Sequence, residues 1–200
     1  MQITCIDYKQ FCKRTGRDPS MTSYVRDTVS VPGSWLAGGA IRRTLMGMPL
    51  DSDYDFFFQD EVALEAFDTK IIDELGLKRV KETEHHTQYE GSLQGIDFIV
   101  QAIKFQFYAS AAKVIESFDY TITQFALDQG TLYTTPESLW DLGRKRLAIN
   151  KVTYPVSTMR RMIKYSNQGF TACAGCMGDL FTQTIENPMT WQTFDIQYID

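Results

Sequence analysis

Residues 35–58 read WLAGGAIRRTLMGMPLDSDYDFFF, with two glycines near the start and three aspartates at alternate positions before three phenylalanines. Its pattern predicts a short strand over 34–37, a helix over 39–46 and an aromatic-rich strand over 53–59. The pair Gly38–Gly39 stands where the first strand meets the helix. The predicted functional site lies on this unit of strand, glycine turn, helix and strand.

The glycine turn has the chemistry of a phosphate-binding site. Free backbone amides and the positive end of the helix dipole at Gly38 and Gly39 can hold a phosphate. Arg42 follows one turn later, and a guanidinium matches phosphate oxygens in bidentate fashion. We therefore predict that these three residues bind the triphosphate of a nucleotide.

Two aspartates begin the second predicted strand. Residues i and i+2 of a strand point to the same face, so the carboxylates of Asp53 and Asp55 converge. Holding two adjacent carboxylates ionised requires a cation, because they repel each other. Magnesium prefers oxygen ligands and keeps places for water and phosphate oxygens. Asp53 and Asp55 are therefore the predicted metal-binding and catalytic pair, with Asp51/Asp53 as the competing register.

A third carboxylate on a neighbouring strand would complete a site for two metal ions. Asp97, in the sequence GIDFIV, has apolar neighbours on a predicted strand over 96–103. We predict that Asp97 joins Asp53 and Asp55 as a metal ligand and catalytic residue. The alternative is an aspartate that caps a turn at the edge of a strand.

The rest of the chain is predicted to contain both helices and strands before residue 110 and mainly helices after it. Before residue 110 the predicted helices cover 7–14, 22–29 and 60–75, and the strands cover 77–87, 88–93 and 96–103, with turns at Glu90-Gly91 and Gln94-Gly95. Later helices are predicted over 110–117, 119–128, 136–142, 156–167 and 173–184. We expect a boundary near residue 137.

Composition excludes several classes of protein. A hydrophobic fraction of 44% with 13% aromatic residues suffices for a core, which excludes a disordered chain. Four cysteines are too few for a disulfide framework. No apolar run could span a bilayer and the first residues lack the features of a signal peptide, so we expect a cytoplasmic protein with no membrane partner.

Charge is unevenly distributed along the chain. The net charge of −5 argues against a general nucleic-acid coat, and no DNA partner is expected. Residues 142–178 contain seven Lys or Arg and no acidic residue, which leaves the rest of the chain strongly acidic. This distribution suits an anionic substrate held locally. The alternative is a solvated helical face.

The stretch AGGAIRRTLMGMPLDSDYDFFF resembles the head of the polymerase-beta-type nucleotidyltransferase superfamily, above all that of class II tRNA CCA-adding enzymes and bacterial poly(A) polymerases. The signature of that family is a Gly-Gly, a Val-Arg-Asp, a Leu-x-Gly-x-x-Pro and an Asp-x-Asp. The matching residues here are Gly38, Gly39, Arg42, Leu45, Gly47, Pro49, Asp53 and Asp55. One residue is inserted before the aspartate pair, and Arg43 replaces the usual Asp.

Three later blocks resemble the same family in the same order. They are SFDYTITQFALD, matching at Asp119 to Ile122, LWDLGRKRL, matching at Asp141 and Leu142, and PVSTMRRMIKYSNQGF, matching at Pro155, Arg160, Gly169 and Phe170. The resemblance implies an α+β fold with two parts. Residues 1–137 would form a catalytic head, with a mixed, mostly antiparallel sheet flanked by helices, and residues 138–200 a small helical neck.

The resemblance places Asp119 and Arg160 in the nucleotide pocket, but it is incomplete. Ser117 and Phe118 stand where the family has two arginines that help to hold ribose and phosphates. The family's base-choosing residues fall on Thr153, Tyr154 and Ser157. Domains that grip tRNA in the family have no counterpart in this sequence.

The activity that the resemblance implies is magnesium-dependent nucleotidyl transfer. Such an enzyme moves a nucleoside monophosphate from an NTP to an acceptor hydroxyl and releases pyrophosphate, with two Mg²⁺ ions. The leading acceptor, by analogy, is the 3′ end of an RNA such as tRNA. A protein side chain or a small molecule is an alternative acceptor, and a non-catalytic nucleotide-binding module is an alternative function.

Overall fold

The computed structural model describes residues 1–51 and 53–186. Within them, eight strands form one mixed sheet in the order β1-β8-β7-β2-β3-β6-β5-β4. These strands are β1 (Thr4–Asp7), β2 (Ser34–Ala37), β3 (Tyr54–Phe58), β4 (Lys78–Glu82), β5 (His86–Leu93), β6 (Ile96–Ile103), β7 (Ala126–Asp128) and β8 (Thr131–Thr134). β3 and β6 run parallel, and the other neighbours are antiparallel.

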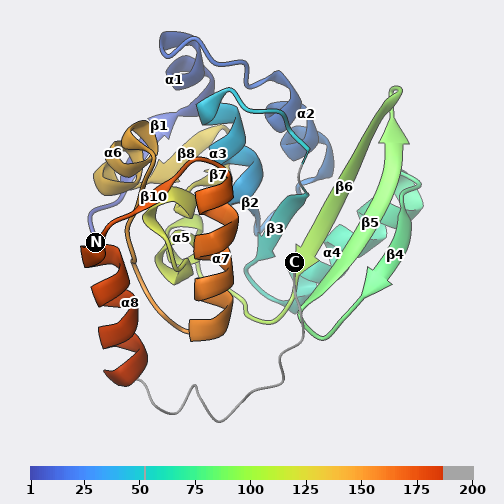
Figure 1. The fold of residues 1–200 in the computed structure, drawn as a ribbon. Coiled ribbons are helices and arrows are strands. Elements are labelled where there is room, and N and C mark those ends of the chain that lie inside the picture. The colour runs from blue at the N-terminus through green and yellow to red at the C-terminus, as the bar shows by residue number, and fades with distance from the viewer. Residues whose placement is uncertain (52, 187–200) are drawn as a thin grey trace.

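Helices pack on both faces of this sheet (Figure 1). The helices are α1 (Tyr8–Arg14), α2 (Ser20–Val29), α3 (Gly39–Met46), α4 (Glu61–Thr69), α5 (Ala111–Ser117), α6 (Pro136–Arg144), α7 (Pro155–Asn167) and α8 (Ala174–Glu186). A π-helical turn, η1 (Lys70–Glu74), extends α4, and a 3₁₀ turn, η2 (Thr121–Thr123), precedes β7. Two further strands, β9 (Arg146–Leu147) and β10 (Thr171–Ala172), pair with each other near α7 and α8. The expected α+β class is confirmed.

Alternation along β3 fills both faces of the sheet. Phe56 and Phe58 pack against Phe67 of α4 in the larger buried cluster. Phe57 points the other way, into a second cluster with Tyr108 and residues of α5. Because successive side chains of a strand alternate, Asp55 shares the face of Phe57. The aromatic run therefore anchors the strand that carries the aspartates.

The helix predicted over 119–128 is wrong. These residues form η2 and then β7, which pairs with β8 in a hairpin. Gln129 and Gly130 both have positive φ and form the two-residue turn of that hairpin. The apolar spacing of the segment resembles that of a helix because η2 and β7 are buried on both faces.

The turn predicted at Glu90-Gly91 is also wrong, because both residues lie inside β5. A Cβ on Gly91 would lie 2.9 Å from Cγ of Leu77, so the glycine allows a close approach of Leu77 to the strand. The turn predicted at Gln94-Gly95 is confirmed, and both residues have positive φ.

The predicted boundary between head and neck falls inside α6, near its first turn. Asp141 of that helix is fully buried, and its carboxylate accepts a hydrogen bond from Thr121 Oγ1 at 2.7 Å. α6 is thus tied to η2, and the division into head and neck remains a prediction. Residues 187–200 of the predicted neck lie outside the described residues. No described helix is long and apolar enough to cross a membrane.

Candidate active site

The glycine turn and the aspartates meet across β2 and β3. Ala37 is paired in register with Asp55, so the chain enters the turn directly beside that carboxylate. Gly38 has φ +82°, a conformation that favours glycine, and its N–H donates to the carbonyl of Phe125 at 2.8 Å. A Cβ on Gly39 would meet no atom within 4 Å. The start of α3 is therefore open above the turn, where its first N–H groups lack helical partners.

The loop after α3 sets which aspartates form the pair. Gly47 ends α3 in the left-handed conformation, and Arg43 Nη1 then donates to the carbonyl of Pro49 at 3.0 Å. The same nitrogen lies 2.5 Å from the exposed carboxylate of Asp51. Arg43 thus replaces the family's Asp with a side chain that holds Asp51 in the loop. This geometry favours the Asp53/Asp55 register.

Asp53 and Asp55 flank the buried Tyr54 at the start of β3, and both are partly buried. Burial, together with the neighbouring charge of Asp53, raises the pKa of Asp55 to about 7. Burial also raises the pKa of Asp53. The pair therefore carries its full negative charge only at a cost that a nearby cation would remove.

β6 brings an amide to this pair instead of a third carboxylate. Gln101 is in register with Asp55, and its Nε2 donates a short hydrogen bond to Oδ2 of Asp53. The same register places Ile99 beside Asp53. Asp97 lies four residues before Gln101 and two before Ile99, so it is about 13 Å along the strand from the level of Asp55 and about 7 Å from that of Asp53, and it is exposed. The structure thus does not bring Asp97 to Asp53 and Asp55, and no three His, Cys, Asp or Glu of the described residues are grouped to hold a metal.

α7 supplies the positive charge of the site. Charges of Lys164 and Arg161 act on Asp55 and favour its ionised form. Arg161 Nη1 also donates to Oδ2 of the buried Asp119 at 2.8 Å. The predicted pocket residue Asp119 therefore positions Arg161. We call Asp53 and Asp55 the acidic wall, and Arg161 and Lys164 the basic wall. Arg160, the arginine predicted from the resemblance, is partly buried on the same helix.

The predicted phosphate ligand Arg42 is buried beneath α7. Its guanidinium carbon lies 4.6 Å from the ring centre of Tyr165 and 5.4 Å from that of Phe170. Only 2% of the residue is exposed, and its Nε and Nη1 have no hydrogen-bond partner among the described residues. Burial lowers the pKa of Arg42. The contact therefore joins α3 to α7 and keeps Arg42 away from the open turn.

Phe118 lies next to the glycine turn, where the family has an arginine. Its ring packs edge-on against Phe57 with the ring centres 5.5 Å apart. Its Cζ is the nearest atom, at 3.9 Å, to a Cβ placed on Gly38. An aromatic ring therefore stands beside the turn where the resemblance to CCA-adding enzymes would place a positive charge.

Solved structures with the same fold include a CCA-adding enzyme in complex with ATP. It shares 18% sequence identity and a TM-score of 0.66, covering 96% of this chain and 49% of that one. An apo form of a CCA-adding enzyme matches with a TM-score of 0.60 at 18% identity, over 94% of this chain and 48% of that one. The chain spans about half the length of these proteins. The predicted resemblance is confirmed at the level of the nucleotidyltransferase fold.

The sequence itself identifies a narrower group. Residues 8–145 match the model of the Gabija anti-defense 2 family, Gad2. The chain belongs to the Gabija anti-defense 2 family. No curated protein sequence matches it.

The acidic wall of this Gad2 family member suits a divalent cation. Its two carboxylates are two residues apart, one just before β3 and one within it, and both residues are partly buried. Two carboxylates beside the open glycine turn provide oxygen ligands of the kind that Mg²⁺ uses when water and phosphate oxygens complete its shell. Asp53 and Asp55 would hold the ion, whereas Gln101 contributes a hydrogen bond to Asp53.

Three residues of the Gad2 site were not predicted from the sequence: Gln101, Arg161 and Lys164. Gln101 carried a usable signal, because it lies four residues after Asp97 on the same face of a strand. Arg161 and Lys164 are three apart and so share a helix face, as their sequence positions indicate. Only the packing of α7 shows that this face looks toward the aspartates.

Proposed function

We propose that this protein is a magnesium-dependent nucleotidyltransferase, which transfers a nucleoside monophosphate from an NTP to an acceptor hydroxyl and releases pyrophosphate. One observation carries the proposal: the acidic wall lies beside the open glycine turn in register, and the basic wall faces it from α7. The nucleotidyltransferase fold supports it. We infer that the reaction serves the anti-defense role named by the family's description.

Each part of the site has a task in this proposal. The amide of Gly39 binds the triphosphate at the start of α3, where the dipole favours negative charge, whereas the predicted amide of Gly38 already donates to the carbonyl of Phe125. Arg161 and Lys164 neutralise the departing pyrophosphate. Bound by Asp53 and Asp55, Mg²⁺ would supply charge neutralisation for the acceptor oxygen and the phosphates.

A second candidate function is a nucleotide-binding module without turnover. The observation that favours it is Gln101, a neutral amide at the position on β6 that faces the aspartate pair. Two-metal chemistry is weakened when the site offers only two carboxylates. Such a module would bind NTP at the same turn and release no pyrophosphate.

The acceptor is a separate question from the reaction. An RNA 3′ end is the acceptor suggested by the neighbours, which include CCA-adding enzymes and a tRNA-processing enzyme complex of TM-score 0.53 at 18% identity, covering 91% of this chain and 47% of that one. A protein side chain or a small molecule would need the same nucleotide site and a different neighbouring surface.

The test is a screen of the four NTPs with Mg²⁺ and mixed acceptors, read as pyrophosphate release and as label transfer. Asp53→Asn and Asp55→Asn should each lower pyrophosphate release by at least about a hundredfold, because each removes a ligand of the ion. Asp51→Asn, the matched control from the competing register, should lose less than about tenfold. Equal losses in all three variants would contradict the proposed pair. Tight NTP binding without pyrophosphate in any arm would establish the second candidate.

A further inference from the structure

A groove of about 970 Å³ opens beside the acidic wall, on the side away from α7. Asp53 lines its inner end, and β4, β5 and β6 form its floor. Leu50 and Met21 of α2 close its other side. A molecule in this groove would reach the aspartates without crossing the nucleotide site.

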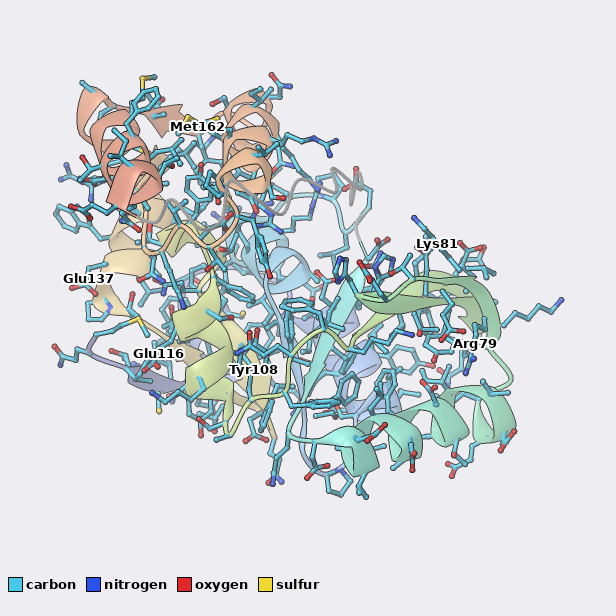
Figure 2. All side chains as sticks on the ribbon, turned by 90° about the horizontal axis from the view of Figure 1, so that it is seen from below. Arg79, Lys81, Tyr108, Glu116, Glu137 and Met162 are labelled. Atoms are coloured by element: carbon cyan, nitrogen blue, oxygen red, sulfur yellow. The ribbon has the colours of Figure 1, made fainter. Side chains whose placement is uncertain are left out.

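The lining comes from both faces of these strands. Gly91, Ile96 and Phe98 line the groove from the side of α4, whereas Glu90, Asp97 and Ile99 line it from the face that α4 leaves uncovered. Tyr89 and Val100 point to the opposite face and are fully buried. Arg79 of β4 also turns to that side, where it lies 3.1 Å from Asp68 of α4. Figure 2 shows Lys81 on the other face, turned away from α4. No helix of the described chain is drawn over the front of β5 and β6 in Figure 1.

The groove is acidic, in contrast to the basic wall. Glu90 and Asp97 line it together with Asp53, and Lys78 is the one cation among its described lining residues. Neither Glu90 nor Asp97 forms an ion pair within the described part of the chain. An RNA end would bring a phosphate for each nucleotide toward these carboxylates, and like charges this close repel.

The floor between these carboxylates is aliphatic. Ile99 shares the face of Glu90 and Asp97, and Val80 and Ile96, which also line the groove, are 48% and 40% exposed. A lysine or arginine side chain complements this lining, because its cationic head can pair with the carboxylates and its apolar stem can pack against the aliphatic side chains. Three strands spaced about 4.8 Å apart give a floor about 10 Å wide, enough for a few residues of an extended chain.

We propose that this groove binds the acceptor, and that the acceptor is a basic segment of a polypeptide carrying a Ser, Thr or Tyr hydroxyl. The inference rests on the proposed function and names its acceptor. The side-chain oxygen forms a bond to the α-phosphorus of the NTP, and the bond from that phosphorus to the bridging oxygen breaks. Pyrophosphate leaves with the electron pair, and the hydroxyl proton passes to solvent.

The test presents labelled NTP and Mg²⁺ with one hydroxyl-bearing peptide in three versions, flanked by lysine and arginine, by glutamine or by glutamate. Further arms contain a tRNA pool, an oligoribonucleotide and a small cationic amino sugar. We expect label on the basic peptide, with kcat/KM at least about tenfold above that of the acidic version. Label on RNA, or on the amino sugar in preference to the peptide, would overturn the inference while leaving the proposed function intact.

Matched variants test the groove itself. Glu90→Gln with Asp97→Asn should lower the preference for the basic over the neutral peptide to less than about a third of its value. Glu65→Gln with Glu137→Gln removes the same charge from α4 and α6 and should leave that preference unchanged. Figure 2 shows Glu137 far from Lys81. An equal effect of both pairs would contradict the groove.

Direct binding separates the two proposals. Fluorescence anisotropy of the labelled basic peptide needs no turnover, and it should show affinity at least about tenfold above that of the acidic peptide. If no NTP gives pyrophosphate in any arm, the proposed function fails. The affinity for the basic peptide relative to the acidic peptide then decides by itself whether the groove binds a basic segment. Equal affinity for the basic and acidic peptides would overturn the groove assignment, whatever the chemistry does.

Discussion

The acidic wall and the basic wall are built in different ways. Asp53 and Asp55 sit on a strand whose aromatic residues fill both faces of the sheet, so their positions follow from the core. Arg161 and Lys164 sit on α7, which is held by the ion pair to Asp119 and by the stacking of Arg42 on Tyr165. The acidic wall is therefore carried by the centre of the sheet, whereas the basic wall depends on how α7 packs, through Tyr165 in the same core cluster and through the contacts of Arg161 and Arg42.

The largest effect on stability is expected from removing a buried aromatic side chain of β3, the strand that carries the acidic wall. Phe56→Ala should lower the free energy of unfolding by about 3–5 kcal/mol, because it empties a fully buried site between β3 and α4. Phe181→Ala on α8, where the side chain is 59% exposed, is the matched control and should cost less than about 0.5 kcal/mol. Denaturant unfolding measures both. Similar costs would mean that β3 is not anchored as described.

The pH dependence of the free energy of unfolding tests whether Asp55 is protonated near neutral pH in the folded protein. The pKa of Asp55 is about 7 in the folded protein and near 4 when unfolded, so the folded state binds more protons between these values. Without metal, the free energy of unfolding should therefore fall as pH rises from about 5 to 8, by up to about 2 kcal/mol. Asp55→Asn should remove this slope.

Added Mg²⁺ tests the same protonation of Asp55. At pH 6 the ion must displace a proton from the pair, whereas at pH 8 it meets two carboxylates, so the gain in Tm should be larger at pH 8. Thermal unfolding at matched ionic strength measures this gain. A gain that is larger at pH 6 would contradict metal binding by Asp53 and Asp55.

Substitutions in the basic wall should change the affinity for NTP more than the free energy of unfolding. Lys164→Gln and Arg161→Gln should each weaken NTP affinity about tenfold, which corresponds to about 1.4 kcal/mol, with a larger loss at low salt. Arg161→Gln should also lower stability, since Asp119 would stay buried without its partner. Lys151→Gln, an exposed lysine of the same basic segment, is the control and should change affinity less than about twofold. Isothermal titration at two salt concentrations measures these effects.

The smallest effect is expected at Arg42, which joins α3 to α7. Arg42→Met should change the free energy of unfolding by less than about 1 kcal/mol, because losing the cation–π contacts is offset by removing a buried cation with unpaired N–H groups. NTP affinity should change less than about threefold. A tenfold loss of affinity would instead support the phosphate-binding role that the resemblance gives to Arg42.

Much of the acidic wall could be predicted from the sequence because its determinants are local. Strand, glycine turn, helix and strand within residues 34–58 are encoded by patterns that span only a few residues each. The segment 119–128 was not predictable in the same way, because η2 and β7 are largely buried on both sides and lose the alternation that marks a strand, whereas β8 keeps it. β1 is paired through its register with β8, far along the chain, and no local pattern indicated it.

Local patterns were sufficient to predict the nucleotidyltransferase fold, the aspartate pair and the glycine turn, because the residues that form these features are neighbours in the chain. Tertiary structure alone decided what faces them. Pairing of β3 with β6 puts Gln101 beside the aspartates and leaves Asp97 in the groove, and packing of α7 turns Arg161 and Lys164 toward them while burying Arg42. Such contacts depend on strand register and on helix orientation, which are fixed by burial of the whole core and not by any short stretch of residues.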